Sequence, residues 1–160
     1  MPRLPTPRLP TMATPETGSS PRIRRARASD ATALARLTGQ LGYPAGADRV
    51  LERLAALRGR SQIVLVAEVD GACAAWLHVQ LRPGLTSELT AQVMGLVVEA
   101  EQRSAGIGAR LLLVGEAWAR ARGARRMVIG TRVEREAAHR FYGREGYRLE
   151  KTWRVLAKDL

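Results

Sequence analysis

The sequence has little of what several protein classes require. Its 160 residues include one cysteine, Cys73, so neither an internal disulfide framework nor a cysteine-built zinc site can form. The two histidines, His78 and His139, stand far apart and lack the spacing of metal ligands, so no metal is expected. No apolar run approaches the roughly 18 residues needed to cross a bilayer. These shortages argue against a disulfide miniprotein, a zinc domain and a membrane protein.

Positive charge is the property that the chain has in excess. Lys plus Arg total 26 and Asp plus Glu total 15, which gives a net charge of +11, and Lys151 and Lys158 are the only lysines. A basic surface favours an anionic partner such as nucleic acid, acidic lipid or a phosphate-bearing cofactor. A solvated, arginine-rich surface with no partner has the same composition. The charge therefore indicates an anionic ligand without identifying it.

The first 20 residues differ in composition from the rest of the chain. Five of the eight prolines lie there, and no apolar stretch follows the basic residues as it would in a signal peptide. Because proline removes backbone donors and this composition cannot bury a core, residues 1–20 are predicted to be a disordered tail. One domain is expected over residues 21–160. With no signal peptide and no need for disulfides, a cytoplasmic location is expected.

Hydrophobic spacing predicts the order of strands and helices. Ser29 and Asp30 offer side-chain oxygens that would cap the first helix. Asp70-Gly71 between two β-rich runs is typical of a two-residue hairpin turn. Antiparallel pairs followed by strand–helix–strand units predict a mixed α/β fold. The expected elements are a strand over 23–27, two helices before Gly59, a hairpin over 62–81, a strand over 89–98, a helix over 107–122, a strand over 126–130, a helix over 134–142, and one or two closing strands over 147–160.

The segment LVVEAEQRSAGIGARLL, residues 96–112, carries the most informative motif. A strand ends at Val98, and a polar connection through Arg103 opens a helix at Gly106-Ile107-Gly108. The first amides of a helix have no internal partner, and glycine lets a phosphate approach them closely. The segment lacks the third glycine of a dinucleotide fingerprint and the lysine of a P-loop. The motif therefore predicts a pyrophosphate site, although the glycines also suit a tight turn that binds nothing.

Two motifs together resemble the GNAT acetyltransferases. Arg103-x-x-Gly106-Ile107-Gly108 after Val-Val-Glu resembles the coenzyme A signature of that superfamily. Downstream, EAAHRFYGREGY over 136–147 resembles its A-x-x-F-Y-x-x-x-G-[FY] helix and strand. The resemblance covers residues 22–158. The chain departs from it at Arg135, where the family often has Asn, and at Ala100, where it commonly has Pro.

The resemblance implies both a fold and a cosubstrate. The fold is a GNAT-like, mixed and mostly antiparallel sheet of six or seven strands flanked by about four helices, with a V-shaped splay between strands four and five. Acetyl-CoA lies in this splay in the family. Its pantetheine arm would pair with the backbone of Leu96, Val97 and Val98. Its pyrophosphate would be held by Arg103, Ser104, Ala105, Gly106, Ile107, Gly108 and Ala109.

The resemblance also implies catalytic roles. An amine would attack the thioester directly in a ternary complex, with a backbone N–H near Val98 polarising the carbonyl. Tyr142, at the family's tyrosine position, is the expected general acid, and a core role is the alternative. Some members carry a basic glutamate where this chain has Gln92, which cannot accept a proton. Glu88 is therefore the candidate base and His78 the alternative, although both also suit purely structural roles.

The expected function is acetyl-CoA-dependent N-acetyl transfer to a primary amine of a small molecule or peptide. One alternative is a nucleic-acid-binding module, which the arginines over 22–27 and 120–126 favour. Only 4% of residues are aromatic and no helix-turn-helix pattern is present, so no nucleic-acid partner is expected. A second alternative is a catalytically silent acyl-CoA-binding sensor. Because exposed edge strands are often covered by a second copy, a homodimer is also expected.

Overall fold

The computed structural model describes residues 20–160, so the tail predicted over residues 1–20 lies outside the described part except for Ser20. None of the helices in residues 20–160 is both long and apolar enough to span a membrane. The elements are β1 (Arg22–Arg25), η1 (Ala28–Asp30), α1 (Ala31–Gln40), α2 (Ala47–Ala56), β2 (Gln62–Val69), β3 (Ala72–Arg82), β4 (Thr90–Val98), η2 (Ala100–Gln102), α3 (Ile107–Arg120), β5 (Arg126–Ile129) and α4 (Glu136–Arg144). Up to residue 144 this order confirms the predicted elements.

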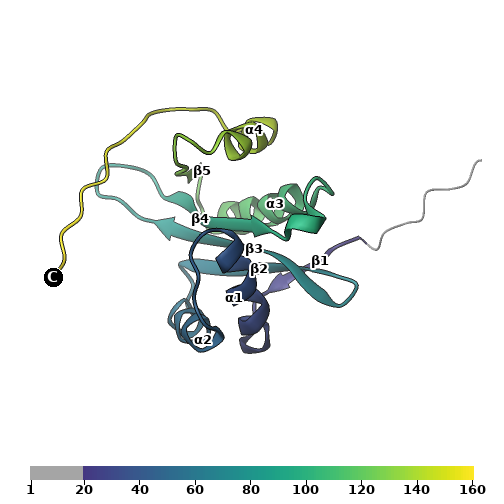
Figure 1. Cartoon of the computed structure of the whole chain (residues 1–160). Helices are drawn as coiled ribbons and strands as arrows, with labels where there is room; N and C mark the ends of the chain where they lie inside the picture. The colour runs from purple at the N-terminus through teal and green to yellow at the C-terminus, as the bar shows by residue number, and fades with distance from the viewer. Residues whose placement is uncertain (1–19) are drawn as a thin grey trace, which may run out of the picture.

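The five strands form one sheet in the order β1-β2-β3-β4-β5. The first three pairs are antiparallel, and β4 and β5 are parallel. Asp70 and Gly71 have φ angles of 48° and 80°, which confirms the predicted tight turn between β2 and β3. In Figure 1, α1 and α2 lie on one side of the sheet, and α3 and α4 lie on the other. The predicted mixed, mostly antiparallel α/β class is confirmed.

The main core lies between the sheet and α3. Leu77 and Val79 of β3 are fully buried there against Leu111 and Leu112 of α3, and Tyr142 of α4 joins the same cluster. Alternate strand residues point toward opposite faces, so the intervening residues of β3 face α1 and α2. On that side α1 contributes its own buried leucines, Leu34 and Leu37. The sheet is therefore packed on both faces, and its parallel end lies beside α3 and α4.

Asp30 is held by two arginines and does not cap α1. Its carboxylate oxygens accept hydrogen bonds from the Arg24 guanidinium at 2.8 and 2.9 Å and from the Arg27 N–H at 2.7 Å. Arg24 also donates to Glu68 of β2 at 3.0 Å. Neither Ser29 nor Asp30 makes the predicted side-chain cap on α1, so that prediction is wrong. The guanidinium is the stronger, charge-assisted partner and takes the carboxylate instead.

The closing strands predicted over residues 147–160 are absent. No regular secondary structure follows α4, and residues 148–160 are all exposed. The described sheet consequently has five strands where six or seven were expected. A β-strand needs a neighbouring strand to pair its N–H and C=O groups. This segment is not paired with β5, the sheet's last strand, and so remains extended coil.

Candidate functional site

The sheet opens between β4 and β5 in the way the resemblance implied. β5 pairs only with Thr90–Val93, the first part of β4. At that point β4 carries a bulge, because Val79 of β3 faces Val93 while His78 faces Gly95 and Met94 is left over. A bulge bends and twists its strand. Beyond it, residues 96–98 pair with β3 alone, so their other edge has backbone groups that no strand of the described chain uses.

The loop between β4 and α3 presents unpaired amides. Ser104 and Gly106 both have positive φ angles, 67° and 76°, and residues 103–106 are exposed. Among the hydrogen bonds of residues 20–160, none is donated by an amide from Ser104 to Ala109, and the first of the helix runs from the Arg110 N–H to the Gly106 carbonyl. Such N–H groups at a helix N-terminus form a ready anion site. The predicted pyrophosphate residues thus form one continuous turn, which is exposed at residues 103–106 and buried at Ile107 and Gly108.

The two glycines of this turn have different surroundings. A Cβ on Gly106 would meet no atom within 4 Å, so it would project into open space on the exposed side. A Cβ on Gly108 would lie 3.1 Å from the Phe141 ring and 3.5 Å from Val98. Gly108 therefore lets the first turn of α3 pack against α4. Arg103 folds back, and its Nε donates to the Val98 carbonyl at 3.2 Å.

Tyr142 lies in the core below this turn. It is 9% exposed, and its ring meets Phe141 and Tyr147 edge-to-face at centroid distances of 5.0 and 5.7 Å. Burial raises the pKa of Tyr142 to about 12, and the positive charge of Arg135 counteracts part of that rise. No hydrogen bond of its hydroxyl is found within residues 20–160. At neutral pH this group is therefore a protonated donor without a partner in the described chain.

Arg135 connects helices from opposite sides of the sheet. It stands at the start of α4, and its Nη2 donates to the Leu41 carbonyl at the end of α1 at 3.0 Å. A side-chain methyl of Leu41 lies 3.9 Å from the position of a Cβ on Gly95, just beyond the bulge in β4. The bond therefore crosses the mouth of the splay. The sequence identified Arg135 only as a departure from the family motif.

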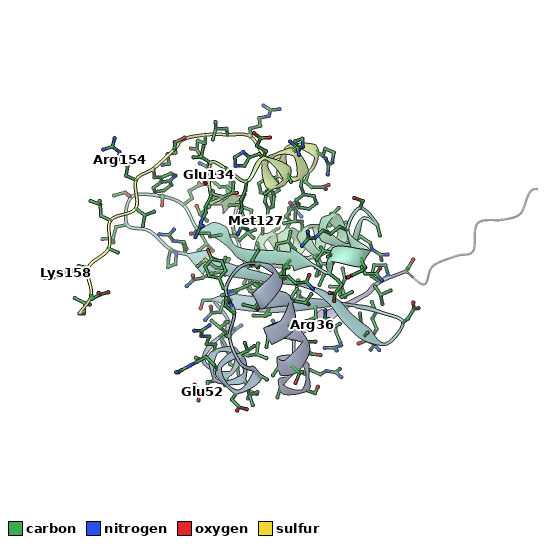
Figure 2. All side chains as sticks on the ribbon, in the orientation of Figure 1. Arg36, Glu52, Met127, Glu134, Arg154 and Lys158 are labelled. Carbon is green, nitrogen blue, oxygen red and sulfur yellow. The ribbon has the colours of Figure 1, made fainter. Side chains whose placement is uncertain are left out.

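A polar network fixes α1 to the end of β4. Glu99 accepts hydrogen bonds from Arg36 and Gln40, which lower the pKa of its carboxyl group. The Gln40 side-chain oxygen in turn accepts from the Ala100 N–H at 3.2 Å. Figure 2 shows Arg36 projecting from α1 beside the sheet. Sequence reasoning missed this network, because Arg36 and Gln40 lie about 60 residues before their partners.

Uncharged polar side chains cross the sheet on the side of α1 and α2. Gln62, Gln80 and Gln92 stand opposite one another on β2, β3 and β4. His78 bonds to Gln62 at 3.1 Å, and burial lowers the pKa of its imidazole. Gln92 accepts from Arg82. The sequence singled out Gln92 and His78. The strand register that brings them beside Gln62 and Gln80 depends on tertiary structure. Polar residues at alternate strand positions were the sequence signal that could have indicated this row.

Glu88 lies at the other end of β4 from the splay. It is exposed in the loop before Thr90, and its carbonyl accepts from the Thr90 hydroxyl at 3.2 Å. Strands rise about 3.3 Å per residue, so residues 96–98 lie about 30 Å further along the chain. The structure therefore places Tyr142 in the same core cluster as Ile107 of the turn, while Glu88 lies at the other end of β4.

Comparison with known proteins adds independent information. The sequence model of the acetyltransferase (GNAT) family matches residues 30–147. An aminoglycoside N(6')-acetyltransferase type 1 from Stenotrophomonas maltophilia is 32% identical over 144 residues, which cover 86% of this chain and 92% of that protein. The matched region includes the turn, the splay and α4.

Solved structures share the fold at lower identity. An aminoglycoside antibiotic 6'-N-acetyltransferase from Acinetobacter baumannii matches with a TM-score of 0.78 and 20% identity, covering 88% of this chain and 99% of that one. A protein described as a transcriptional regulator from Bacillus halodurans matches with a TM-score of 0.79 and 19% identity, covering 87% and 100%. These likenesses establish the arrangement of the strands and helices.

Proposed function

Because the chain belongs to the GNAT acetyltransferase family and is an N-acetyltransferase, we propose that it transfers the acetyl group of acetyl-CoA to a primary amine of a small molecule. One observation carries this proposal. The free edge of β4 at residues 96–98 is followed, after η2, by the turn at Ser104–Ala109, whose amides donate no hydrogen bond in the described chain and whose residues 104–106 are exposed. A strand edge and an anion site in series match the two polar parts of coenzyme A, the amide-bearing arm and the diphosphate.

The residues present fit this cosubstrate. An extended amide chain can add to a free strand edge through main-chain hydrogen bonds, which Leu96–Val98 offer. A diphosphate needs several donors and positive charge, which the amides of Ser104–Ala109, the α3 dipole and Arg103 supply. Arg103 would exchange its bond to the Val98 carbonyl for one to the anion. Acetyl-CoA supplies an acetyl group bound to sulfur as a good leaving group.

The protein's part in the reaction is to position donors. A main-chain N–H on the free edge near Val98 would stabilise charge that develops on the acyl oxygen. Tyr142 would donate its proton to the departing sulfur, and its pKa of about 12 keeps that proton in place at neutral pH. The amine attacks directly and forms the new C–N bond while the C–S bond breaks. Glu88 stays the predicted proton acceptor, and its distance along β4 means that the proton would reach it through solvent.

The acceptor is proposed to be a small molecule bearing amine and hydroxyl groups. The relative from Stenotrophomonas maltophilia is named for an aminoglycoside, which is such a molecule. Gln62, Gln80 and Gln92 offer amide donors and acceptors in a row on the sheet face of α1 and α2. Amide side chains bind hydroxyls and amines without requiring a charged partner. The homodimer expected from the edge strands stays a prediction.

Two titrations and one assay test the function. Acetyl-CoA should raise the melting temperature of the protein. Duplex DNA should raise the melting temperature only if the chain binds nucleic acid, and added salt should then abolish that rise. A panel of aminoglycosides, polyamines, amino acids and peptides with free N-termini should then show thiol release with at least one small-molecule amine. Binding of acetyl-CoA without release on any amine would favour the silent sensor. No stabilisation by acetyl-CoA would contradict the proposal itself.

A further inference from the structure

Arg135 carries a positive charge that no acid in residues 20–160 neutralises. It stands at the start of α4, and its Nη2 donates to the Leu41 carbonyl at the end of α1 at 3.0 Å. None of the ion pairs found in this part of the chain includes Arg135. Because a carbonyl is neutral, the bond fixes the guanidinium without cancelling its charge. A net positive charge is therefore held where α1 and α4 approach each other across the splay.

The end of α1 keeps this guanidinium in place. The amides of Leu41, Gly42 and Tyr43 donate to carbonyls of residues 37–39, and no backbone amide of residues 20–160 donates to the Leu41 carbonyl. That carbonyl is consequently free to accept from Arg135. A Cβ on Gly42, whose φ angle is 97°, would lie 3.9 Å from the same Nη2, so the guanidinium lies beside this turn. The negative end of the α1 dipole favours a cation at this position.

Arg135 and Tyr142 lie on the same side of α4. They are seven residues apart in the sequence, and two turns of an α-helix take about 7.2 residues. Side chains on a helix lean toward its N-terminus, so this spacing brings the Tyr142 hydroxyl back toward Arg135. Tyr142 is 9% exposed, and no hydrogen bond of its hydroxyl is found within residues 20–160. The side chain that is expected to donate a proton thus has a fixed cation on its own helix face.

The charges around Tyr142 have the sign that proton donation requires. Burial raises the pKa of Tyr142 to about 12, and the positive charge of Arg135 lowers it. The nearby acids act on a different tyrosine, because burial raises the pKa of Tyr147 and Glu116 and Glu145 raise it further. Glu116 also accepts the Tyr147 hydroxyl at 2.8 Å. A positive charge stabilises a phenolate relative to its phenol, so Arg135 makes Tyr142 a stronger acid.

We propose that Arg135 is a positioning residue for acetyl transfer, whose guanidinium, fixed by the end of α1, stabilises the phenolate that forms when Tyr142 gives its proton to the departing sulfur. This inference rests on the proposed function. In that step the C–S electron pair takes the proton and forms an S–H bond, while the O–H electron pair stays on the tyrosine oxygen. The proton that the attacking amine loses passes to solvent, which returns a proton to Tyr142.

Turnover tests the role of the charge. Arg135→Gln keeps a donor for the Leu41 carbonyl but removes the charge, so kcat should fall about tenfold while KM for acetyl-CoA changes little. Arg135→Lys keeps the charge and should retain most of the wild-type kcat. Equal kcat values in wild type and Arg135→Gln, or an equal fall in the Gln and Lys variants, would overturn the proposal. Circular dichroism melts show whether both variants are folded.

Arg140→Gln is the matched control for these variants. It removes the same charge from the same helix, but Arg140 is turned away from the side of Arg135 by its spacing of five residues. The Arg140 guanidinium pairs with Glu136 and is exposed. This variant should keep the wild-type kcat. A fall in kcat equal to that of Arg135→Gln would mean that any charge on α4 has the same effect, and would overturn the specific role of Arg135.

A double-mutant cycle shows whether Arg135 acts through Tyr142. In a Tyr142→Phe background no phenolate can form, so Arg135→Gln should lower kcat no further. A second, full loss of kcat in the double variant would mean that Arg135 acts independently of Tyr142, and would overturn the proposal. A wild-type kcat in Tyr142→Phe alone would overturn it as well, because the acid that Arg135 is proposed to assist would then be absent.

Titration of tyrosinate separates this proposal from the proposed function, because it needs neither cosubstrate nor turnover. The difference in ultraviolet absorbance between chains with and without Tyr142→Phe gives the pKa of Tyr142. This pKa should rise above its wild-type value of about 12 in Arg135→Gln and stay unchanged in Arg140→Gln. An unchanged pKa in Arg135→Gln would overturn the proposal. A raised pKa in a chain that acetylates no amine would instead contradict the proposed function, and with it the role of Arg135 in transfer.

Discussion

Two regions of this molecule differ in whether their hydrogen-bond donors have acceptors. Around Asp30, the Arg24 guanidinium and the Arg27 N–H donate to carboxylates at 2.7–3.0 Å, and Arg24 also donates to the Arg25 carbonyl at 3.2 Å. Around the turn at Ser104–Ala109, consecutive amides meet no acceptor in the described chain. The first region is largely buried, whereas residues 104–106 of the second are exposed to solvent. A group buried without a partner costs free energy, whereas an exposed one remains free to bind a ligand.

The difference separates stability from function. Satisfied donors hold β1, η1 and β2 together, and a ligand could gain nothing from them. Unsatisfied donors contribute little to the fold, but a ligand can pair with all of them at once. Substitutions in the first region should therefore change unfolding and leave cosubstrate affinity alone, and substitutions in the second should do the reverse. The following predictions test this separation, starting with the largest effect.

Removing the carboxylate of Asp30 should have the largest effect on stability. Asp30→Ala leaves the Arg24 guanidinium, whose side chain is 17% exposed, without its main partner. Breaking such a partly buried pair should lower the free energy of unfolding by about 3 kcal/mol. Urea denaturation measures this loss, and the affinity for acetyl-CoA should stay unchanged in the folded fraction. Asp48→Ala, an exposed control in the first turn of α2, should cost no more than about 0.5 kcal/mol.

The same pair predicts how stability depends on acid. Arg24 holds the pKa of Asp30 below its ordinary value of 3.8. Its contribution is therefore present at neutral pH and is lost as the pH falls below 3.8 and through the lower, folded value. Asp30→Asn should remove this part of the acid dependence. An Asp30→Asn variant as stable as the Asp48→Ala control would show that the pair of Arg24 and Asp30 contributes little to stability.

Tyr142→Phe should have the next largest effect, and on turnover. The ring stays, so packing is kept, and the lost hydroxyl had no partner in the described chain. If it protonates the leaving sulfur, kcat should fall about 100-fold with little change in stability. Tyr147→Phe is the reciprocal control: it loses a 2.8 Å bond to Glu116, which should cost about 1 kcal/mol of stability and leave kcat intact. Equal kcat values in wild type and Tyr142→Phe would show that Tyr142 is not the general acid.

Alkaline pH gives a further readout for this tyrosine. Because burial raises the pKa of Tyr142 to about 12, activity should not decline near pH 10, as it would with an ordinary phenol. The raised pKa also means that its contribution to stability is complete below pH 10 and is lost as the pH rises through about 12. Ultraviolet titration of tyrosinate in wild type and Tyr142→Phe measures the pKa directly.

A pair of glycines at the two ends of α3 provides a sharper and smaller test. Gly106 and Gly123 have φ angles of 76° and 88°, and an added Cβ would meet no atom within 4 Å at either site. Alanine should therefore cost about 1 kcal/mol of stability at both positions. Only Gly106→Ala disturbs the amides of the turn, so only it should weaken acetyl-CoA binding, by about tenfold or 1.4 kcal/mol. Calorimetric titration of both variants measures the affinity for acetyl-CoA. Equal affinities would mean that the diphosphate does not bind at the turn.

The smallest predicted effect concerns the network that fixes α1 to β4. Glu99→Gln keeps the shape of the side chain but removes the charge that pairs with Arg36. A partly exposed ion pair of this kind contributes up to about 1 kcal/mol, so KM for acetyl-CoA should rise about fivefold at most. Glu52→Gln removes a more exposed pair with Arg49 on α2, away from the turn, and should leave KM unchanged. Equal KM values in both variants would mean that the network does not position the turn.

Local chemistry was predictable from the sequence where neighbours in the chain decide it. Asp70-Gly71 gave the hairpin, and Gly106-Ile107-Gly108 after a strand gave the helix start with its free amides, since both depend on a few consecutive residues. Contacts between distant segments were not predictable in this way. The bond from Arg135 to Leu41 spans 94 residues, and the bulge at Met94 reflects pairing with β3. Asp30 shows the same limit, because it accepts hydrogen bonds from Arg24 and does not make the helix cap that local spacing predicts.

The sequence by itself determined the kinds of elements, their order and the motif at the turn, because periodicity and backbone preferences act over short distances. Tertiary structure alone decided which strand edges stay free, which glutamines share a face and where the last residues go. Those outcomes depend on the pairing partner that each backbone group finds in space. Residues 147–160 show both sides of this division: their pattern predicted one or two closing strands, and residues 148–160 have no regular secondary structure in the folded chain.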